Sequence, residues 1–182
     1  MAREKLILTY QDYLKMPDDR TRKEILGGDL YVTPAPTPAH QRVVVRLASL
    51  LSTHVEHHGP GEVFVSPIDV VLSQTDVVQP DIVFVVGANT HIIGEAAVQG
   101  PPDLVIEVLS PSTVKLDRGR KMGLYARSGV AEYWIVDPDN RSVEVYRLEG
   151  SAYRLELRAH EGDMIRSDLF PGLVISPAGL WR

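Results

Sequence analysis

The hydrophobic residues of this chain follow helical spacing in some segments and strand-like patterns in others. In residues 39–55 they recur every three or four positions, which predicts a helix with one buried face. Gly59-Pro60-Gly61 should end that helix. Runs rich in β-branched and apolar residues follow and predict buried strands at 63–72, 82–86, 104–109 and 133–136.

Capping and turn residues predict two more helices and a hairpin. Thr9 is a suitable N-cap for a short helix that ends before Pro17. Gly27-Gly28 joins two strand-like runs, and paired glycines supply the positive φ of a tight hairpin turn. Residues 117–127 are expected to form a helix that Gly129 closes.

The remaining patterns complete an α/β protein. Residues 34–38 are rich in proline and predict an extended bridge. Residues 143–146 and 153–157 alternate between apolar and polar, which is typical of antiparallel strands with one solvated face. There is no internal repeat and no long linker. We therefore expect a single domain over residues 1–182, with a mixed central sheet flanked by helices, an N-terminal helix and hairpin, and C-terminal antiparallel strands.

Composition narrows the class of protein. The chain has 182 residues, of which 44% are hydrophobic and 24% charged, close to soluble globular averages. It has no cysteine, which excludes disulfides, cysteine nucleophiles and thiolate zinc sites. No apolar run is long enough to cross a membrane, and the first apolar stretch is too short for a signal peptide. We expect a cytoplasmic protein.

The distribution of charge is more informative than its sum. The net charge of −5 argues against a protein that coats nucleic acid by bulk positive charge. It does not exclude an enzyme that holds phosphates with one basic patch around an acidic metal site. The densest basic stretch, residues 115–127, has five Lys and Arg against one Asp, a local charge of +4. Its members other than Lys121 are candidate contacts to a DNA backbone: Lys115, Arg118, Arg120 and Arg127.

Two carboxylates occupy positions that should be buried. Glu107 stands in the middle of Leu104-Val105-Ile106-Glu107-Val108-Leu109, a strand that is apolar on both faces. An ionised carboxylate there is costly unless it meets a cation or a metal. Asp81 stands at the start of another buried strand. A divalent ion between the two would remove their repulsion, and hard oxygen ligands suit magnesium.

Lys121 provides a cation on the helix that follows the Glu107 strand. It lies four residues from both Asp117 and Tyr125, so the three share a helix face. In one interpretation, the side chain of Lys121 points toward the carboxylates of Asp81 and Glu107. The alternatives remain open: a surface pair between Lys121 and Asp117, a salt-bridged Glu107, and an Asp81 that only starts its strand.

Several blocks of the sequence carry a family resemblance. They are Gln79-Pro80-Asp81, Glu107-Val108-Leu109-Ser110-Pro111-Ser112, Lys121 with Tyr125, Glu132-Tyr133-Trp134-Ile135-Val136-Asp137-Pro138 and, in the N-terminal half, Glu24-Ile25, Gly28-Asp29-Leu30 and Pro36 with His40-Gln41. Together they resemble the Uma-type putative restriction endonuclease family of the PD-(D/E)XK nuclease superfamily, over roughly residues 9–150.

The resemblance implies a restriction-endonuclease-like fold and a Mg²⁺-dependent endonuclease that cleaves DNA, with Mn²⁺ as a substitute. Asp81 and Glu107 would be its metal-binding acids, and the carbonyl of Val108 a further ligand. Leu109 occupies the usual lysine position, so the family's lysine would be Lys121 on the next helix. Glu24 would be the additional acidic residue.

Other predictions are less specific. His40, Gln79 and Tyr125 are possible cleft residues, although His40 could equally cap or pack against its helix. The C-terminal strands suggest self-association as a homodimer or a larger homo-oligomer. The alternative function is a catalytically inactive DNA-binding or oligomeric structural module with a nuclease-like fold.

Overall fold

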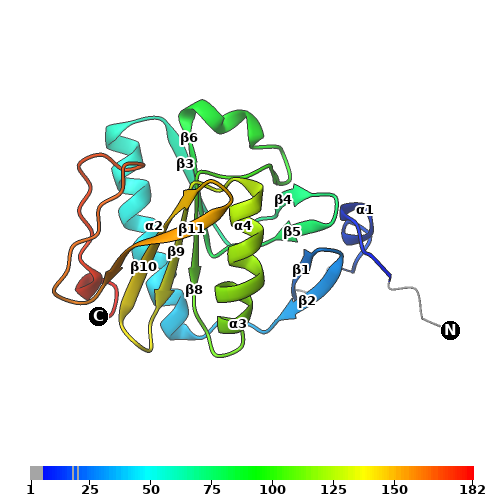
Figure 1. Cartoon of the computed structure of the whole chain (residues 1–182), viewed down its shortest axis with the longest axis horizontal. Helices are drawn as coiled ribbons and strands as arrows, with labels where there is room; N and C mark the ends of the chain where they lie inside the picture. Colours follow the sequence, from blue (N-terminus) through cyan, green and yellow to red (C-terminus); the bar gives the residue numbers. More distant parts are fainter. Residues whose placement is uncertain (1–5, 18, 20) are drawn as a thin grey trace.

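The structure is a computed structural model that describes residues 6–17, 19 and 21–182, and the strands of these residues form two sheets (Figure 1). The six-stranded sheet has the order β11 (Ala152–Ala159), β10 (Ser142–Glu149), β9 (Glu132–Asp137), β8 (Leu104–Val108), β6 (Ile82–Val86), β3 (Gly61–Val65). The five-stranded sheet has the order β2 (Asp29–Thr33), β1 (Arg22–Leu26), β5 (Asp76–Val78), β4 (Val70–Ser73), β7 (Val98–Gln99). Both sheets are mixed, because β8 pairs with β9, and β4 with β7, in parallel.

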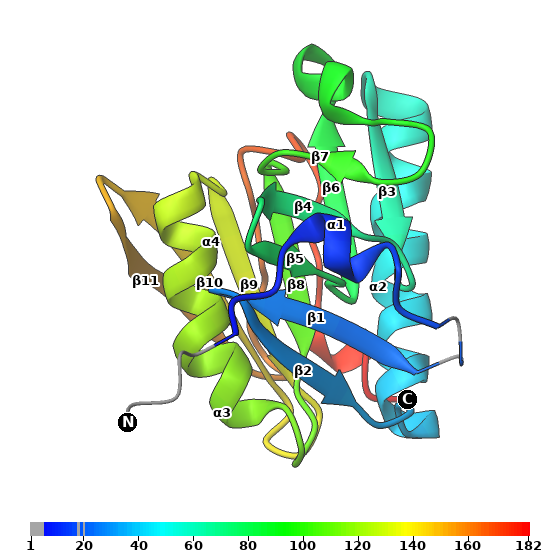
Figure 2. The same cartoon turned by 90° about the vertical axis from the view of Figure 1, so that its right-hand side faces the viewer.

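Helices lie on both faces of the six-stranded sheet, as Figure 2 shows for α2 and α4. The helical elements are α1 (Tyr10–Tyr13), α2 (Pro38–His58), the 3₁₀ turn η1 (Gly87–Ile92), α3 (Val114–Leu116), the π-helical turn η2 (Asp117–Lys121), α4 (Met122–Ser128) and the 3₁₀ turn η3 (Pro177–Gly179). None of the helices in the described ranges combines the length and apolar character that a membrane span needs.

The alternation of side chains along the central strands explains the layers. Even-numbered residues of β8, such as Ile106, pack with α2 residues such as Leu47 in one core. Odd-numbered residues, such as Val105, pack with Leu124 and Tyr125 of α4 in a second core on the other face. Glu107 is also odd-numbered, so it is on the α4 side of the sheet.

The predicted hairpin turn and the predicted end of the helix at Gly129 are confirmed. Leu26 pairs with Asp29 across the turn, and Gly27 and Gly28 have φ values of 58° and 78° there. Gly129 closes α4 with a left-handed φ of 91°. The expected mixed α/β class is confirmed as well, although the strands divide between two sheets.

The strand predicted over residues 63–72 is wrong as a single element. Residues up to Val65 belong to β3, and the next strand, β4, starts at Val70 in the other sheet. Pro67 lies between them, and a proline has no N–H to donate to a ladder. The helix predicted at 117–127 also differs, because it starts earlier, at α3, and passes through a π turn at Asp117–Lys121.

Candidate active site

Asp81 and Glu107 face each other across neighbouring strands. β6 and β8 are antiparallel with Ile82 opposite Ile106, so the next position places Asp81 opposite Glu107. Both residues are buried, with 3% and 1% of their surface exposed. The shared register puts the two carboxylates on the same face of the sheet, where a cation would have to accompany them.

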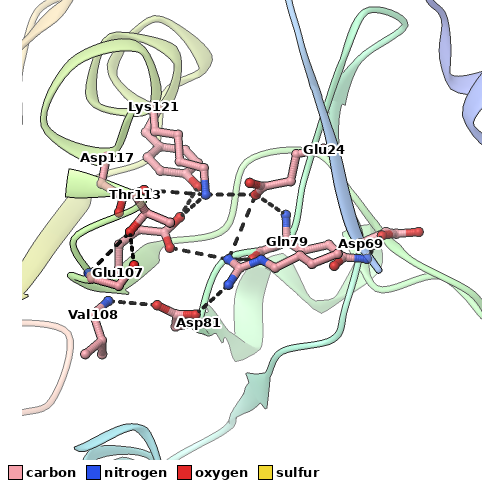
Figure 3. Close-up of polar contacts among 12 residues, drawn as sticks. Glu24, Asp69, Gln79, Asp81, Glu107, Val108, Thr113, Asp117 and Lys121 are labelled. Carbon is pink, nitrogen blue, oxygen red and sulfur yellow. Dashed lines mark hydrogen bonds and ion pairs between the residues drawn. The ribbon is translucent and has the colours of Figure 1, made fainter. Parts of the chain in front are cut away.

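Polar groups from three elements surround the Asp81 carboxylate, and Figure 3 shows the contact with Val108. Its Oδ2 accepts a hydrogen bond of 2.8 Å from the N–H of Val108 and lies 3.1 Å from Nε2 of His40 at the start of α2. Its Oδ1 lies 2.9 Å from Nη1 of Arg22. Burial opposes the ionisation of Asp81, but His40, Arg22 and the Val108 N–H outweigh it and lower the pKa of this carboxyl. Asp81 is therefore an anion at neutral pH.

Glu107 lies deeper and is held from the other side. Lys121 Nζ lies 3.0 Å from its Oε1, and the hydroxyl of Tyr125 donates a 2.7 Å hydrogen bond to the same oxygen. Burial and the nearby carboxylates of Asp117 and Asp81 raise the pKa of Glu107 to about 8, although Lys121 opposes the shift. Glu107 is therefore harder to ionise than Asp81, and its cations favour the ionised form.

Lys121 is a fully buried ammonium among three carboxylates. Its Nζ lies 2.8 Å from Glu24, 3.0 Å from Glu107 and 3.6 Å from Asp117. Burial disfavours the charged amine, but these acids raise its pKa above the ordinary value. Lys121 is the last residue of the π turn, and π turns inside helices frequently occur at functional sites. The pair with Asp117 exists, but it is buried and not on the surface.

Glu24 reaches the site from the five-stranded sheet. Its Oε1 accepts a 2.8 Å hydrogen bond from the N–H of Gln79 in addition to its contact with Lys121. Its Oε2 is buried without a hydrogen-bond partner among the described residues. The hairpin β1–β2 thus contributes a carboxylate to a site whose other carboxylates lie on or beside the six-stranded sheet and on η2. We call Glu24, Asp81, Glu107 and Asp117 the acidic cluster.

Sequence reasoning missed two charged residues of this site. Asp117 was considered only as a surface partner of Lys121, yet it is 1% exposed, and burial raises its pKa. Arg22 was not singled out, although its guanidinium contacts Asp81, Glu107 and, at 4.0 Å, Glu24. A signal for Arg22 existed, because residues two apart in a strand share a face and Glu24 is two positions away.

Three members of the acidic cluster, Asp81, Glu107 and Asp117, border a cavity of about 220 Å³. Arg22, His40, Asp81, Glu107, Asp117 and Lys121 are among its lining residues. A larger groove of about 860 Å³ shares Arg22, His40 and Asp81 with the cavity and continues past Val32 and Pro67. Of these carboxylates, Asp81 therefore lines both the cavity and the larger groove.

The three possible cleft residues differ in position. His40 lines the cavity beside Asp81. Tyr125 is fully buried and reaches the site through its hydroxyl. The side chain of Gln79 turns away and donates to Asp69 at 2.8 Å, although Gln79 also lines the larger groove.

The four basic candidates for DNA contact are also distributed unevenly. Arg118 pairs with Glu144 at 2.6 Å, Arg120 with Asp29 at 3.1 Å, and Arg127 with Asp76 at 3.6 Å; these are ion pairs to the protein itself. Lys115 is exposed, with no ion pair to any described residue. Lys115 and Arg120 line a depression that shares Thr33, Pro34, Ser112 and Thr113 with the cavity. These two cations are therefore placed beside the site.

Comparisons with known proteins agree with this architecture. The family model Uma2, described as "Putative restriction endonuclease", matches residues 10–178. Two uncharacterized proteins of Synechocystis sp. are similar: slr1290 is 28% identical over 87% of this chain and 83% of its own length. The second, sll1609, is 26% identical over 79% of this chain and 82% of its own length. A crystal structure titled as a putative nuclease belonging to DUF820, from Anabaena variabilis, superposes with a TM-score of 0.80 at 19% identity and covers 96% of this chain and 97% of that one.

Proposed function

The chain belongs to the Uma2 family of putative restriction endonucleases, and from this premise we propose that it is a Mg²⁺-dependent endonuclease that hydrolyses DNA phosphodiester bonds. The observation that carries the proposal is the pair of buried carboxylates, Asp81 and Glu107, opposite each other at the edge of a cavity. Burial of such a pair is unfavourable without a cation. Its position therefore favours a site built for one.

The donor set fits a hard divalent ion. Among the described residues, no group of three His, Asp or Glu side chains is arranged as a metal centre made of side chains alone. Magnesium does not need one, because it is commonly bound by one or two carboxylates and keeps several waters. Asp81, Glu107 and the Val108 carbonyl would hold it, with Mn²⁺ as a substitute. Glu24 Oε2 and Asp117 Oδ1 accept no hydrogen bond from the described residues and are further acceptors for a water or a second ion.

The protein's own residues would hold the reacting groups in place. When bound, Mg²⁺ would lower the pKa of a water and offset negative charge that develops on the phosphate. His40 and the Val108 N–H fix one oxygen of Asp81. Lys121 fixes one oxygen of Glu107 and offsets the charge of the acidic cluster, and one of its N–H groups can turn to orient the attacking water.

A plasmid-nicking assay tests this function. We expect the purified protein to nick supercoiled DNA with Mg²⁺ or Mn²⁺ and to stop when EDTA removes the metal. An Asp81→Asn preparation, purified in parallel, controls for contaminating nucleases. Equal nicking by that variant, or nicking in EDTA, would reject the proposal. DNA binding without cleavage under any metal would instead support the inactive DNA-binding module.

Among the four basic candidates, we propose Lys115 as the residue that contacts a DNA phosphate. Because Lys115 is exposed and has no ion pair in the described structure, its charge is available to a phosphate. Lys115→Ala should weaken DNA binding and lower the slope of log affinity against log salt by about 0.9. Fluorescence anisotropy at several salt concentrations measures both. Arg154→Ala is the control, because Arg154 of β11 pairs with Glu149 of β10 and lines neither the cavity nor the groove. An equal slope change in that variant would contradict the role of Lys115.

A further inference from the structure

In each of the two opposed carboxylates, buried groups of the protein contact one of the two oxygens. Asp81 Oδ2 is held by His40 and by the backbone N–H of Val108. Glu107 Oε1 is held by Lys121, a side chain with 1% of its surface exposed. The oxygens that remain for another cation are therefore Asp81 Oδ1 and Glu107 Oε2.

Arg22 contacts both of these remaining oxygens. Its Nη1 lies 2.9 Å from Asp81 Oδ1, and its Nη2 lies 3.6 Å from Glu107 Oε2. The same Nη2 donates to the carbonyl of Gln79, which anchors the guanidinium in this position. The planar guanidinium thus bridges the two acids.

Arg22 is also the member of this arrangement that can leave. Its side chain is 17% exposed, against 4% for Asp81 and 2% for Glu107, so it lies on the solvent side. It is the first residue of β1, and it lines both the cavity and the larger groove. Its Nε has no hydrogen-bond partner among the described residues. Movement of the guanidinium into the groove would therefore not open the core.

We propose that Arg22 is a resident counter-ion of Asp81 and Glu107, and that a divalent cation binds this site only by displacing its guanidinium. This inference rests on the metal site of the proposed function. A metal and the guanidinium need the same two oxygens, and two cations in one small site repel each other. Arg22 would stabilise the metal-free protein and, by competition, lower its affinity for the metal.

A titration without DNA tests the competition. Isothermal titration of Mn²⁺ into the wild type and into Arg22→Gln should show at least about tenfold tighter binding to the variant. Arg154→Gln removes an exposed arginine outside the site and should bind Mn²⁺ like the wild type. The double variant Arg22→Gln with Asp81→Asn should lose the binding, which identifies the site that is being titrated.

Arg22→Gln leaves two buried carboxylates less well neutralised and should unfold at a lower temperature in EDTA, with Mn²⁺ restoring more stability than in the wild type. Arg22→Lys is the second variant, because it keeps the charge but not the planar fork that bridges both acids. Its affinity for Mn²⁺ should lie between those of the wild type and Arg22→Gln.

A crystal structure of the wild-type protein with Mn²⁺ gives an answer that needs no variant. The guanidinium of Arg22 should have left Asp81 Oδ1 and Glu107 Oε2. A metal bound to both acids with Arg22 still in contact would overturn the inference, as would equal or weaker Mn²⁺ binding by Arg22→Gln. Failure of the wild type and of both single Arg22 variants to bind metal would overturn the metal site itself, and the inference with it.

Discussion

Asp81→Asn should abolish metal-dependent cleavage and leave DNA binding intact or slightly tighter. The substitution keeps the size of the side chain and an oxygen that can accept the N–H of Val108, but it removes the charge that a metal needs. We expect the nicking rate to fall by at least ~10²-fold, as for loss of a preorganised electrostatic group. DNA affinity should not fall, because one negative charge near the phosphates is gone.

Asp103→Asn is the matched control for this prediction. Asp103 precedes β8 as Asp81 precedes β6, and it likewise accepts a 2.8 Å hydrogen bond from a backbone N–H, that of Val86. It does not line the cavity. Asp103→Asn should therefore cleave DNA at close to the wild-type rate. If Asp81→Asn lost binding and cleavage together, with a lowered unfolding temperature, Asp81 would be a structural residue.

Lys121→Ala should destabilise the protein much more than Lys115→Ala. The change removes the ammonium that lies between Glu24, Glu107 and Asp117 and leaves buried carboxylates without their cation. Breaking a buried ion pair from one side costs about 3–5 kcal/mol. For a chain of this size, that lowers the unfolding midpoint by roughly 6–20 °C. Calorimetry measures it, with the exposed Lys115→Ala as a control that should stay near the wild type.

The loss of stability in Lys121→Ala should depend on pH in a defined direction. Without the ammonium, the pKa of Glu107 rises above its wild-type value of about 8, further from the ordinary 4.5. The folded variant then holds a proton that the unfolded chain releases, so its stability falls as pH rises from about 4.5 through and beyond 8. Both folded proteins keep this proton up to about pH 8, so the gap between wild type and Lys121→Ala should be similar at pH 5 and pH 7 and should widen above pH 8, where Glu107 ionises in the wild type first. A gap that is constant with pH would assign the loss to packing alone.

Lys121→Ala should also lower turnover by at least ~10²-fold when it is assayed at a temperature where the variant is folded. Affinity for the metal should change little, because the ammonium contacts Glu107 Oε1 and not the oxygen that faces Arg22. Titration of Mn²⁺ into the variant checks this point. Cleavage at the wild-type rate would leave Lys121 with a purely structural role.

Local sequence signals predicted most of the fold because they act over a few residues. The hairpin at Gly27-Gly28 follows from the backbone freedom of glycine, and Gly129 closes α4 for the same reason. The long helix α2 follows from its apolar stripe and begins one residue before the predicted start, at Pro38. The strands β5 and β7 have only three and two residues, too short for a pattern, so their pairing depends on distant partners.

The sequence by itself determined that Glu107 needs a cation, because a carboxylate within an apolar strand has few other ways to be stable. It also indicated Asp81 and Lys121 as members of the same site. Only the tertiary structure decided which oxygens face which cations. Arg22 joined the site through a contact between the hairpin and β8, which are far apart in sequence. Asp117 lies only four residues from Lys121, but only the tertiary structure showed that this pair is buried. Electrostatic partners act through space, so no spacing along the chain specifies that Arg22 meets Glu107.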